Sequence, residues 1–267
     1  MAVKFDLRNK TIVLTGSAGR VGARFSEILS EAGANLILID KDAEKNEKLY
    51  KKIKKQFKTN CLISNTDITN TKEIDNLIKV ILKKYSKIDV LINNAHFIPR
   101  DHPNRDAPFE KYPYELWQKA VSDNLNGVFV CCQKFGKIMA KQKNGSIINI
   151  SSIYGLVGPD QRIYGNSRLN SPPFYSATKG AIVNLTKYLA SYWGEKNVRV
   201  NTLTLGGIFD KKLHTNKEFV REYSKRTMLG RMSQVNDYDG AILFLSSDLS
   251  SYMTGANLII DGGWTSW

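Results

Sequence analysis

Short apolar runs alternate with longer segments of helical periodicity along the whole chain. The apolar runs lie at residues 11–15, 36–39, 90–93, 147–151, 199–203 and 258–260. Strands that alternate with helices in this way pair in parallel, and helices cover both faces of their sheet. The pattern predicts a single α/β domain over residues 1–267, with a doubly wound parallel sheet of about seven strands.

Two irregular stretches, residues 96–113 and 155–173, follow predicted strands and are rich in Pro, Gly, Asn and Arg. Parallel sheets bind ligands beyond the carboxyl ends of their strands, where such loops lie. We therefore expect both stretches to overhang a ligand crevice, the second as an inserted active-site loop.

The formal net charge of +14 raises the question of a nucleic-acid or anionic-membrane partner. The lysines of residues 41–58 and 72–87 are interleaved with Glu and Asp along amphipathic segments, as on solvated helix faces. Nucleic-acid binding requires a concentrated basic patch. We expect neither nucleic acid nor a membrane as partner. The densest basic segment, residues 211–231, lies where a substrate could touch it.

The cysteines and the apolar runs bear on the compartment. Cys61, Cys131 and Cys132 have the spacing of neither a metal site nor a disulfide framework, which fits a reducing compartment. There is no uninterrupted apolar run of about 18 residues, and residues 1–10 lack the apolar middle of a secretory signal. These features predict a cytoplasmic protein without a bound metal.

A glycine-rich turn joins the first predicted strand to the first predicted helix. Glycines at such a turn let the backbone approach a pyrophosphate, which the amides and the dipole of the following helix then stabilise. The alternative is an ordinary tight turn. The order of strand, turn and helix predicts phosphate binding by Gly16, Ser17, Gly19, Arg20, Val21 and Gly22.

Asp40 ends the second predicted strand, roughly twenty residues beyond the glycines, where a carboxylate can accept hydrogen bonds from both ribose hydroxyls of a dinucleotide. It would repel a phosphate on that ribose, so NAD is favoured over NADP. Two alternatives stay open. Asp40 could be a surface residue, and Arg20 or Lys41 could pair with a 2′-phosphate.

Tyr175 and Lys179 are four residues apart in a predicted helix over residues 174–196, so their side chains are neighbours. A free tyrosine has a pKa of about 10 and is a poor base near pH 7. An adjacent ammonium and an oxidised nicotinamide should lower that pKa. Lowering it to about 7 requires about 4 kcal/mol. Tyr175 could then exchange a proton with a substrate oxygen during hydride transfer.

The motifs together resemble the short-chain dehydrogenase/reductase family, in the family's order and over nearly the whole chain. They are the glycine turn at residues 15–22, Asp67, Asn-Asn-Ala at 93–95, Asn124 in Asn-Leu-Asn-Gly, Asn-Ile-Ser-Ser at 149–152, Tyr-Ser-Ala-Thr-Lys at 175–179 and Asp-Gly-Gly at 261–263. The resemblance implies a Rossmann fold and an NAD(P)-dependent alcohol–carbonyl oxidoreductase.

The resemblance also implies roles for particular residues. Ser152 would hydrogen-bond the substrate oxygen, Lys179 would hold the nicotinamide ribose, and Asn124 would position a water on the proton path. The catalytic residues would be Asn124, Ser152, Tyr175 and Lys179. Further cofactor contacts would come from Asp67, Ile68, Asn94, Ala95, Tyr175, Lys179, Gly206 and Ile208. Members commonly form homodimers or homotetramers through the helices that bear Asn124 and Tyr175.

The sequence departs from the family pattern at several positions. Arg20 stands where the classical turn has glycine, and the Gly-x-x-Gly-x-x-Gly spacing is that of the extended branch; the Asp-Gly-Gly strand close to residue 267 favours the classical architecture. His96 replaces a glycine, as a functional polar contact or as a bland loop substitution. Leu205 precedes Gly206 in place of proline, and Asp210 replaces a threonine that contacts the nicotinamide amide.

The interval from Ser152 to Tyr175 is about ten residues longer than usual, which raises Tyr164 as an alternative base. Its i+4 residue is Arg168, however, and Gly165, Asn166 and the Pro172-Pro173 pair disfavour a helix there. Tyr175 is therefore the predicted base.

The extra loop resembles a branch linked to surface-polysaccharide and sugar modification. Its polar side chains are suited to hydroxyls and negative charge: Gln161, Arg162, Tyr164, Asn166, Ser167 and Arg168. With residues 205–231 as a basic lid, the loop predicts a polar, anionic, sugar-type small-molecule substrate. The competing hypothesis is a dinucleotide-binding sensor or scaffold without turnover.

Overall fold

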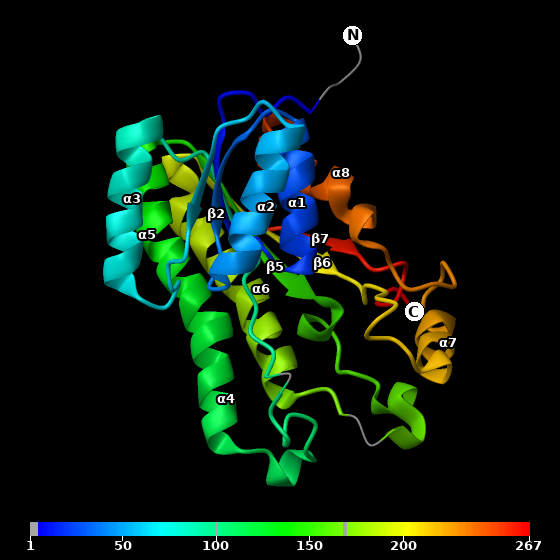
Figure 1. Cartoon of the computed structure of the whole chain (residues 1–267). Coiled ribbons are helices and arrows are strands. Elements are labelled where there is room, and N and C mark those ends of the chain that lie inside the picture. Colours follow the sequence, from blue (N-terminus) through cyan, green and yellow to red (C-terminus); the bar gives the residue numbers. More distant parts are fainter. Residues whose placement is uncertain (1–4, 100, 168–169) are drawn as a thin grey trace.

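The computed structural model describes residues 5–99, 101–167 and 170–267. Its centre is a parallel sheet of seven strands in the order β3-β2-β1-β4-β5-β6-β7 (Figure 1). The strands are β1 Thr11–Thr15, β2 Asn35–Ile39, β3 Cys61–Ser64, β4 Val90–Asn93, β5 Gly145–Ser152, β6 Val198–Leu205 and β7 Asn257–Ile260. The order reverses between β1 and β4, and this switch point is where an open α/β sheet leaves a crevice for a ligand.

Helices cover both faces of the sheet. One face carries α1 Arg20–Glu31, α2 Ala43–Gln56 and α8 Asp239–Ser246, and the other carries α3 Thr71–Tyr85, α5 Gly127–Gln142 and α6 Pro173–Trp193. Figure 1 shows the first set and the second set on opposite sides of the strands. This is the doubly wound Rossmann arrangement predicted from the alternating pattern.

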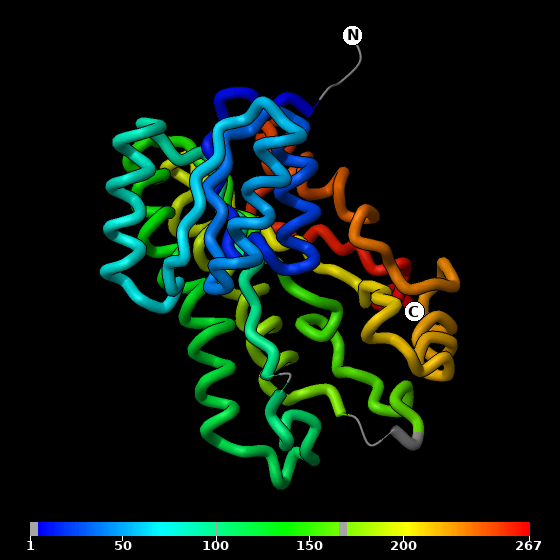
Figure 2. Tube along the Cα trace, in the orientation of Figure 1, coloured from blue at the N-terminus to red at the C-terminus, as the bar shows by residue number. Residues whose placement is uncertain are grey.

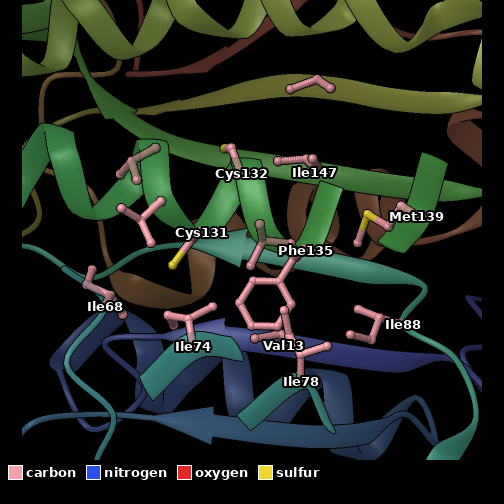
Figure 3. Close-up of a cluster of buried hydrophobic side chains, with 14 of the residues drawn as sticks. Val13, Ile68, Ile74, Ile78, Ile88, Cys131, Cys132, Phe135, Met139 and Ile147 are labelled. Carbon is pink, nitrogen blue, oxygen red and sulfur yellow. The ribbon is translucent and has the colours of Figure 1, made fainter. Parts of the chain in front are cut away.

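The strands alternate their side chains between two cores. Along β1, Val13 faces the core under α3, α5 and α6, whereas Ile12 and Leu14 face the core under α1, α2 and α8. Figure 3 shows the Phe135 ring of α5 pointing toward Val13 of β1 and Ile78 of α3, in the same buried cluster. Because both faces are buried, the strands have nearly continuous apolar sequences.

The segments that leave the carboxyl edge of the sheet form the rest of the molecule. They include α4 Tyr114–Val121 and a π-helical segment, Ser122–Asn126, which runs into α5. A 3₁₀ segment, Gln161–Ser167, bends at Gly165 and lies beside α7 Lys217–Lys225 (Figure 2). A third apolar cluster, which includes Ile163 and Tyr223, joins these two segments.

The sequence prediction located six of the strands to within two residues at each end and left the short strand Cys61–Ser64 without an assigned range. The predicted helix over residues 174–196 is α6 followed by a 3₁₀ turn, Gly194–Lys196. Within residues 5–99, 101–167 and 170–267, no helix has both the length and the apolar character that crossing a membrane requires.

Candidate active site

A cleft of about 620 Å³ opens at the carboxyl ends of β1, β4, β5 and β6. Its volume falls in the range of about 300–1,000 Å³ that is typical of small-molecule sites. Fourteen of the predicted site residues line it: Gly16, Gly19, Arg20, Val21, Gly22, Asp40, Ile68, Asn94, Ala95, Ser152, Tyr175, Lys179, Gly206 and Ile208. The sequence motifs therefore converge on one cavity.

The glycine turn forms one end of this cleft. Gly16 has a φ of 64°, and a Cβ there would lie 2.6 Å from the Cα of Ala95; a Cβ on Gly22 would lie 2.1 Å from the carbonyl oxygen of Gly16. The Asn94 amide donates to the carbonyl of Gly16 at 2.9 Å, which fixes the turn against the loop after β4. Side chains are thus excluded at Gly16 and Gly22, and bare backbone faces the cleft at the amino end of α1. This cradle fits the pyrophosphate of a dinucleotide.

Asp40 lies beside the glycine turn and is held by two backbone amides. Its Oδ2 accepts from the amide of Ala18 at 2.8 Å and its Oδ1 from the amide of Asp42 at 3.0 Å. A carboxylate has about four lone-pair sites, so both oxygens keep capacity for a further donor. The carboxylate is therefore oriented to accept hydrogen bonds from a vicinal diol in the cleft.

The two cations that could hold a 2′-phosphate beside Asp40 are engaged with carboxylates, as is Lys45, which also lines the cleft and pairs with Asp42. Lys41 lies 3.1 Å from Asp67, and Arg20 lies 2.9 Å from Asp210 on the far side of the cleft. Each cation would have to leave or share its partner to hold a phosphate.

Ser152, Tyr175 and Lys179 meet at the other end of the cleft. Ser152 ends β5, and Tyr175 and Lys179 lie one turn apart on α6, which packs against that strand. The Ser152 hydroxyl hydrogen-bonds the Tyr175 phenol. Lys179 is buried and donates from Nζ to the carbonyl oxygen of Ile150 at 2.9 Å. A hydroxyl, a phenol and an ammonium thus surround one point where a reacting oxygen can bind.

The pKa of Tyr175 differs from the sequence-based expectation. Burial raises this pKa, and the hydrogen bond with Ser152 only partly opposes the rise. Lys179 Nζ lies 6.0 Å from the centre of the Tyr175 ring, and burial lowers the pKa of Lys179 itself to about 8. The expected lowering counted on Lys179 together with an oxidised nicotinamide. In the protein alone, desolvation acts on both Tyr175 and Lys179, so Lys179 by itself does not produce it.

Three predicted residues do not line the cleft. Ser17 is buried and donates to Asn46, and Asp67 accepts from Thr69 and pairs with Lys41. Asn124 is buried in the π-helical segment, where its side chain exchanges hydrogen bonds of 2.6 and 3.1 Å with the backbone of Phe97. These side chains shape the walls of the cleft from behind.

Several aromatic side chains surround Tyr175. The rings of His96 and Tyr154 contact it edge-on, with centroid distances of 5.1 and 6.3 Å, and both residues line the cleft together with Tyr223. The sequence analysis left the role of His96 open and assigned none to Tyr154 or Tyr223. Tyr154 could have been found from the sequence, because it directly follows the Ser152-Ile153 pair. No sequence feature pointed to Tyr223 of α7.

Tyr164, the alternative base, lies outside the cleft lining. Its ring stacks on Phe219 of α7 at 5.5 Å, and its hydroxyl hydrogen-bonds the hydroxyl of Tyr154. It therefore supports Tyr154 from behind. The geometry favours Tyr175 as the base, as the sequence predicted.

Several basic residues of the loop and of residues 211–231 pair with carboxylates outside the cleft lining. Arg162 and Arg226 both bind Asp160, and Arg231 binds Asp237. These ion pairs hold the pKa of the Asp160 carboxyl well below its usual range. Arg168 lies outside the described residues. Arg226 thus joins the loop to the end of α7, and none of the described cations of these two segments lines the cleft.

Comparisons with known proteins agree with this geometry. A family model described as enoyl-(acyl carrier protein) reductase matches residues 16–265. Post-translational flagellin modification protein A of Campylobacter coli is 33% identical over 97% of this chain and 99% of its own. Two solved structures are similar throughout. A short chain dehydrogenase from Leptospira borgpetersenii with bound NAD+ is 33% identical, with a TM-score of 0.83 and coverage of 99% of this chain and 97% of its own.

The second solved structure is a gluconate 5-dehydrogenase from Burkholderia cenocepacia in complex with NADP and tartrate. It is 28% identical, with a TM-score of 0.86 and coverage of 98% of both chains. The similarity thus spans the sheet, the cleft and the segments beyond the sheet.

Proposed function

The chain belongs to the short-chain dehydrogenase/reductase family of NAD(P)-dependent oxidoreductases, and we propose that Tyr175 is the acid–base residue with which it interconverts an alcohol and a carbonyl. The observation that carries the proposal is the meeting of Ser152, Tyr175 and Lys179 at one end of a cleft whose other end is a glycine cradle.

The residues of the cradle would hold the dinucleotide. The amino end of α1 and the backbone of Gly16 and Gly19 would bind its pyrophosphate, and Asp40 its adenosine ribose. When bound, the nicotinamide supplies the hydride acceptor or donor and, in its oxidised form, a positive charge. Gly206 and Ile208 line the cleft and would contact the nicotinamide.

The protein side of the reaction is proton transfer at the substrate oxygen. In alcohol oxidation the Tyr175 oxygen takes the hydroxyl proton, and in carbonyl reduction it returns it. Ser152 orients the same oxygen through a hydrogen bond. The Lys179 ammonium uses one of its three donors on Ile150 and has two left for the cleft. With a pKa of about 8, this ammonium is mainly protonated near pH 7, and together with the charge of an oxidised nicotinamide it would favour the phenolate.

Asn124 would act through the backbone at its position. Its side-chain oxygen and nitrogen both bind the backbone of Phe97, and a π-helical segment leaves a backbone carbonyl outside the regular helical pattern. We propose that such a carbonyl binds the water that carries the proton onward to solvent.

The cofactor we propose is NAD. Asp40 would repel a 2′-phosphate, and Lys41 and Arg20 are engaged by Asp67 and Asp210. Similar solved structures hold NAD+ in one case and NADP in the other. The preference therefore depends on the side chains of this chain.

The substrate we propose is a polar, sugar-type alcohol or carbonyl compound. The expected preference for an anionic sugar rested on basic residues of the loop and of residues 211–231, and the described ones do not line the cleft. Tyr154, Tyr175, Tyr223 and His96 offer flat apolar faces with polar edges around the reacting point, a combination that suits polyhydroxylated carbon chains. Two similar proteins, a gluconate 5-dehydrogenase and a flagellin modification protein, have names that support a sugar-type substrate. Residues 155–173 would form the active-site loop and residues 205–231 the lid.

We also propose a homodimer or homotetramer in the cytoplasm. Phe129 of α5 and Tyr188 and Tyr192 of α6 are exposed on helix faces turned away from the sheet, where they could pack against another copy. All three cysteines are free and buried, as suits a reducing compartment.

Replacing Tyr175 by phenylalanine should lower kcat by about 10²–10⁴-fold, because the proton donor and acceptor is lost, while NADH binding changes little. Steady-state turnover and a fluorescence titration with NADH measure the two quantities. Tyr164→Phe is the matched control and should stay within a few-fold of wild type. A Tyr175→Phe enzyme with wild-type turnover, or loss of turnover in Tyr164→Phe alone, would refute the assignment.

A substrate screen tests the proposed reaction and its class. Neutral sugars and polyols, sugar acids, sugar phosphates, sugar nucleotides and small hydrophobic ketones are assayed with both cofactors. We expect kcat/KM for a sugar-type compound to be at least about tenfold above that for the ketones, because unpaired polar groups in the site penalise apolar analogues. Far better turnover of hydrophobic ketones would contradict the class. NADH binding without turnover of any compound would favour the sensor or scaffold.

Replacing Asp40 by alanine should raise the dissociation constant for NADH about 10- to 100-fold, since hydrogen bonds to a charged group contribute about 1.5–3 kcal/mol. The preference for NADH over NADPH should narrow at the same time. Titrations with both cofactors measure the change. Asp248→Asn removes an exposed carboxylate that pairs with Lys10 far from the cleft lining and serves as the control. Unchanged NADH affinity in Asp40→Ala would show that this carboxylate does not bind the ribose.

A further inference from the structure

Arg20 connects the two sides of the cleft. It is the first residue of α1, directly after the glycine turn, and its guanidinium reaches the segment that follows β6. It donates to the carbonyl oxygens of Ile208 and Phe209, both at 3.1 Å, and lies 2.9 Å from Oδ2 of Asp210. The planar guanidinium can satisfy these three acceptors at once, which a lysine could not do in a fixed geometry.

Asp210 is oriented for this contact by its own turn. Its amide donates to Nδ1 of His214 at 2.9 Å, and its Oδ1 accepts from the amide of Lys212 at 2.8 Å. The amides of Leu213 and His214 both donate to its carbonyl oxygen. The turn thus uses Oδ1 and directs Oδ2 to Arg20.

The same segment is anchored to the lid on its other side. The rings of Phe209, His214 and Phe219 stack in series at 5.8 and 5.6 Å, so the position of residues 208–214 is coupled to α7. The amide of Phe209 also donates to the carbonyl of Ser233 at 2.8 Å. Arg20 therefore connects residues 208–214, and through them α7, to the glycine turn at the other side of the cleft.

We propose that Arg20 and Asp210 are positioning residues that latch residues 208–214 across the cofactor cleft, so that the dinucleotide leaves only when this ion pair opens. The inference rests on the proposed function, because it takes the cleft to hold a dinucleotide. The latch spans the region between the cradle and Ile208, and it sets the distance between them. Both side chains are partly exposed, with 38% and 24% of their surface accessible. Such a partly exposed pair adds little to the global free energy of unfolding, so we expect it to act on the local opening of residues 208–214.

The test measures the rate of NADH release. Arg20→Met, Asp210→Asn and the double variant are loaded with NADH, which is then displaced by excess NAD+ in a stopped-flow fluorimeter. Each single variant should release NADH about three- to tenfold faster than wild type. The double variant should be no faster than the faster single variant, since residues that act as one pair are not additive.

A second measurement uses the protein without added cofactor. Amide hydrogen exchange in residues 208–214 should be faster in both single variants than in wild type, and exchange in the β-sheet should be unchanged. This readout reports on the latch even if NADH does not bind. Failure of wild type to bind NADH would overturn the proposed function; unchanged exchange in the variants would overturn the latch.

Arg24 offers a matched control on the same helix. It lies one turn after Arg20 and pairs with Asp239 of α8, outside the cleft lining. Arg24→Met should lower the melting temperature and leave NADH release unchanged. Faster release in Arg20→Met but not in Asp210→Asn would overturn the latch, since Arg20 would then act on the dinucleotide directly. Additive effects in the double variant would overturn it as well.

Discussion

The close contact between α6 and the end of β5 is the constraint on which the site depends. Ser151 donates to the carbonyl oxygen of Lys179 at 3.0 Å, and a Cβ on Gly155 would lie 2.7 Å from that carbonyl group. At this separation the Lys179 ammonium reaches Ile150, and the Tyr175 phenol reaches Ser152. A side chain between the two elements would separate the hydroxyl, the phenol and the ammonium.

The same burial that brings these groups together opposes their ionisation. Desolvation raises the pKa of Tyr175 and lowers that of Lys179, so the protein alone holds a neutral phenol beside a weakened ammonium. Tyr175 must take up a proton in alcohol oxidation and give it back in carbonyl reduction, so neither its protonated nor its ionised form should be strongly favoured. The positive charge that shifts the ionisation of Tyr175 toward the phenolate has to come from the bound cofactor.

The sequence predicted the sheet and most of the residues that line the cleft for a physical reason. Strand and helix periodicity and the Tyr-x-x-x-Lys spacing are local, and parallel strands bring their carboxyl ends to one edge. The roles of Ser17 and Asp67 were less accessible, because whether a turn residue faces a ligand or a neighbouring helix depends on packing. Ser17 turns to Asn46, and Asp67 to Lys41. Likewise, Arg20 and Asp210 were two unrelated departures from a family pattern until the fold paired them across 190 residues.

The central claim is that cofactor charge, added to a buried tyrosine and lysine, sets the acidity of Tyr175. The most direct test is a titration of the phenol by ultraviolet difference spectroscopy between wild type and Tyr175→Phe, with no cofactor, with NADH and with NAD+. The account predicts a pKa above the ordinary value of about 10 without cofactor and a clearly lower pKa with NAD+ than with NADH. A Tyr175 pKa that is the same in all three states would contradict it.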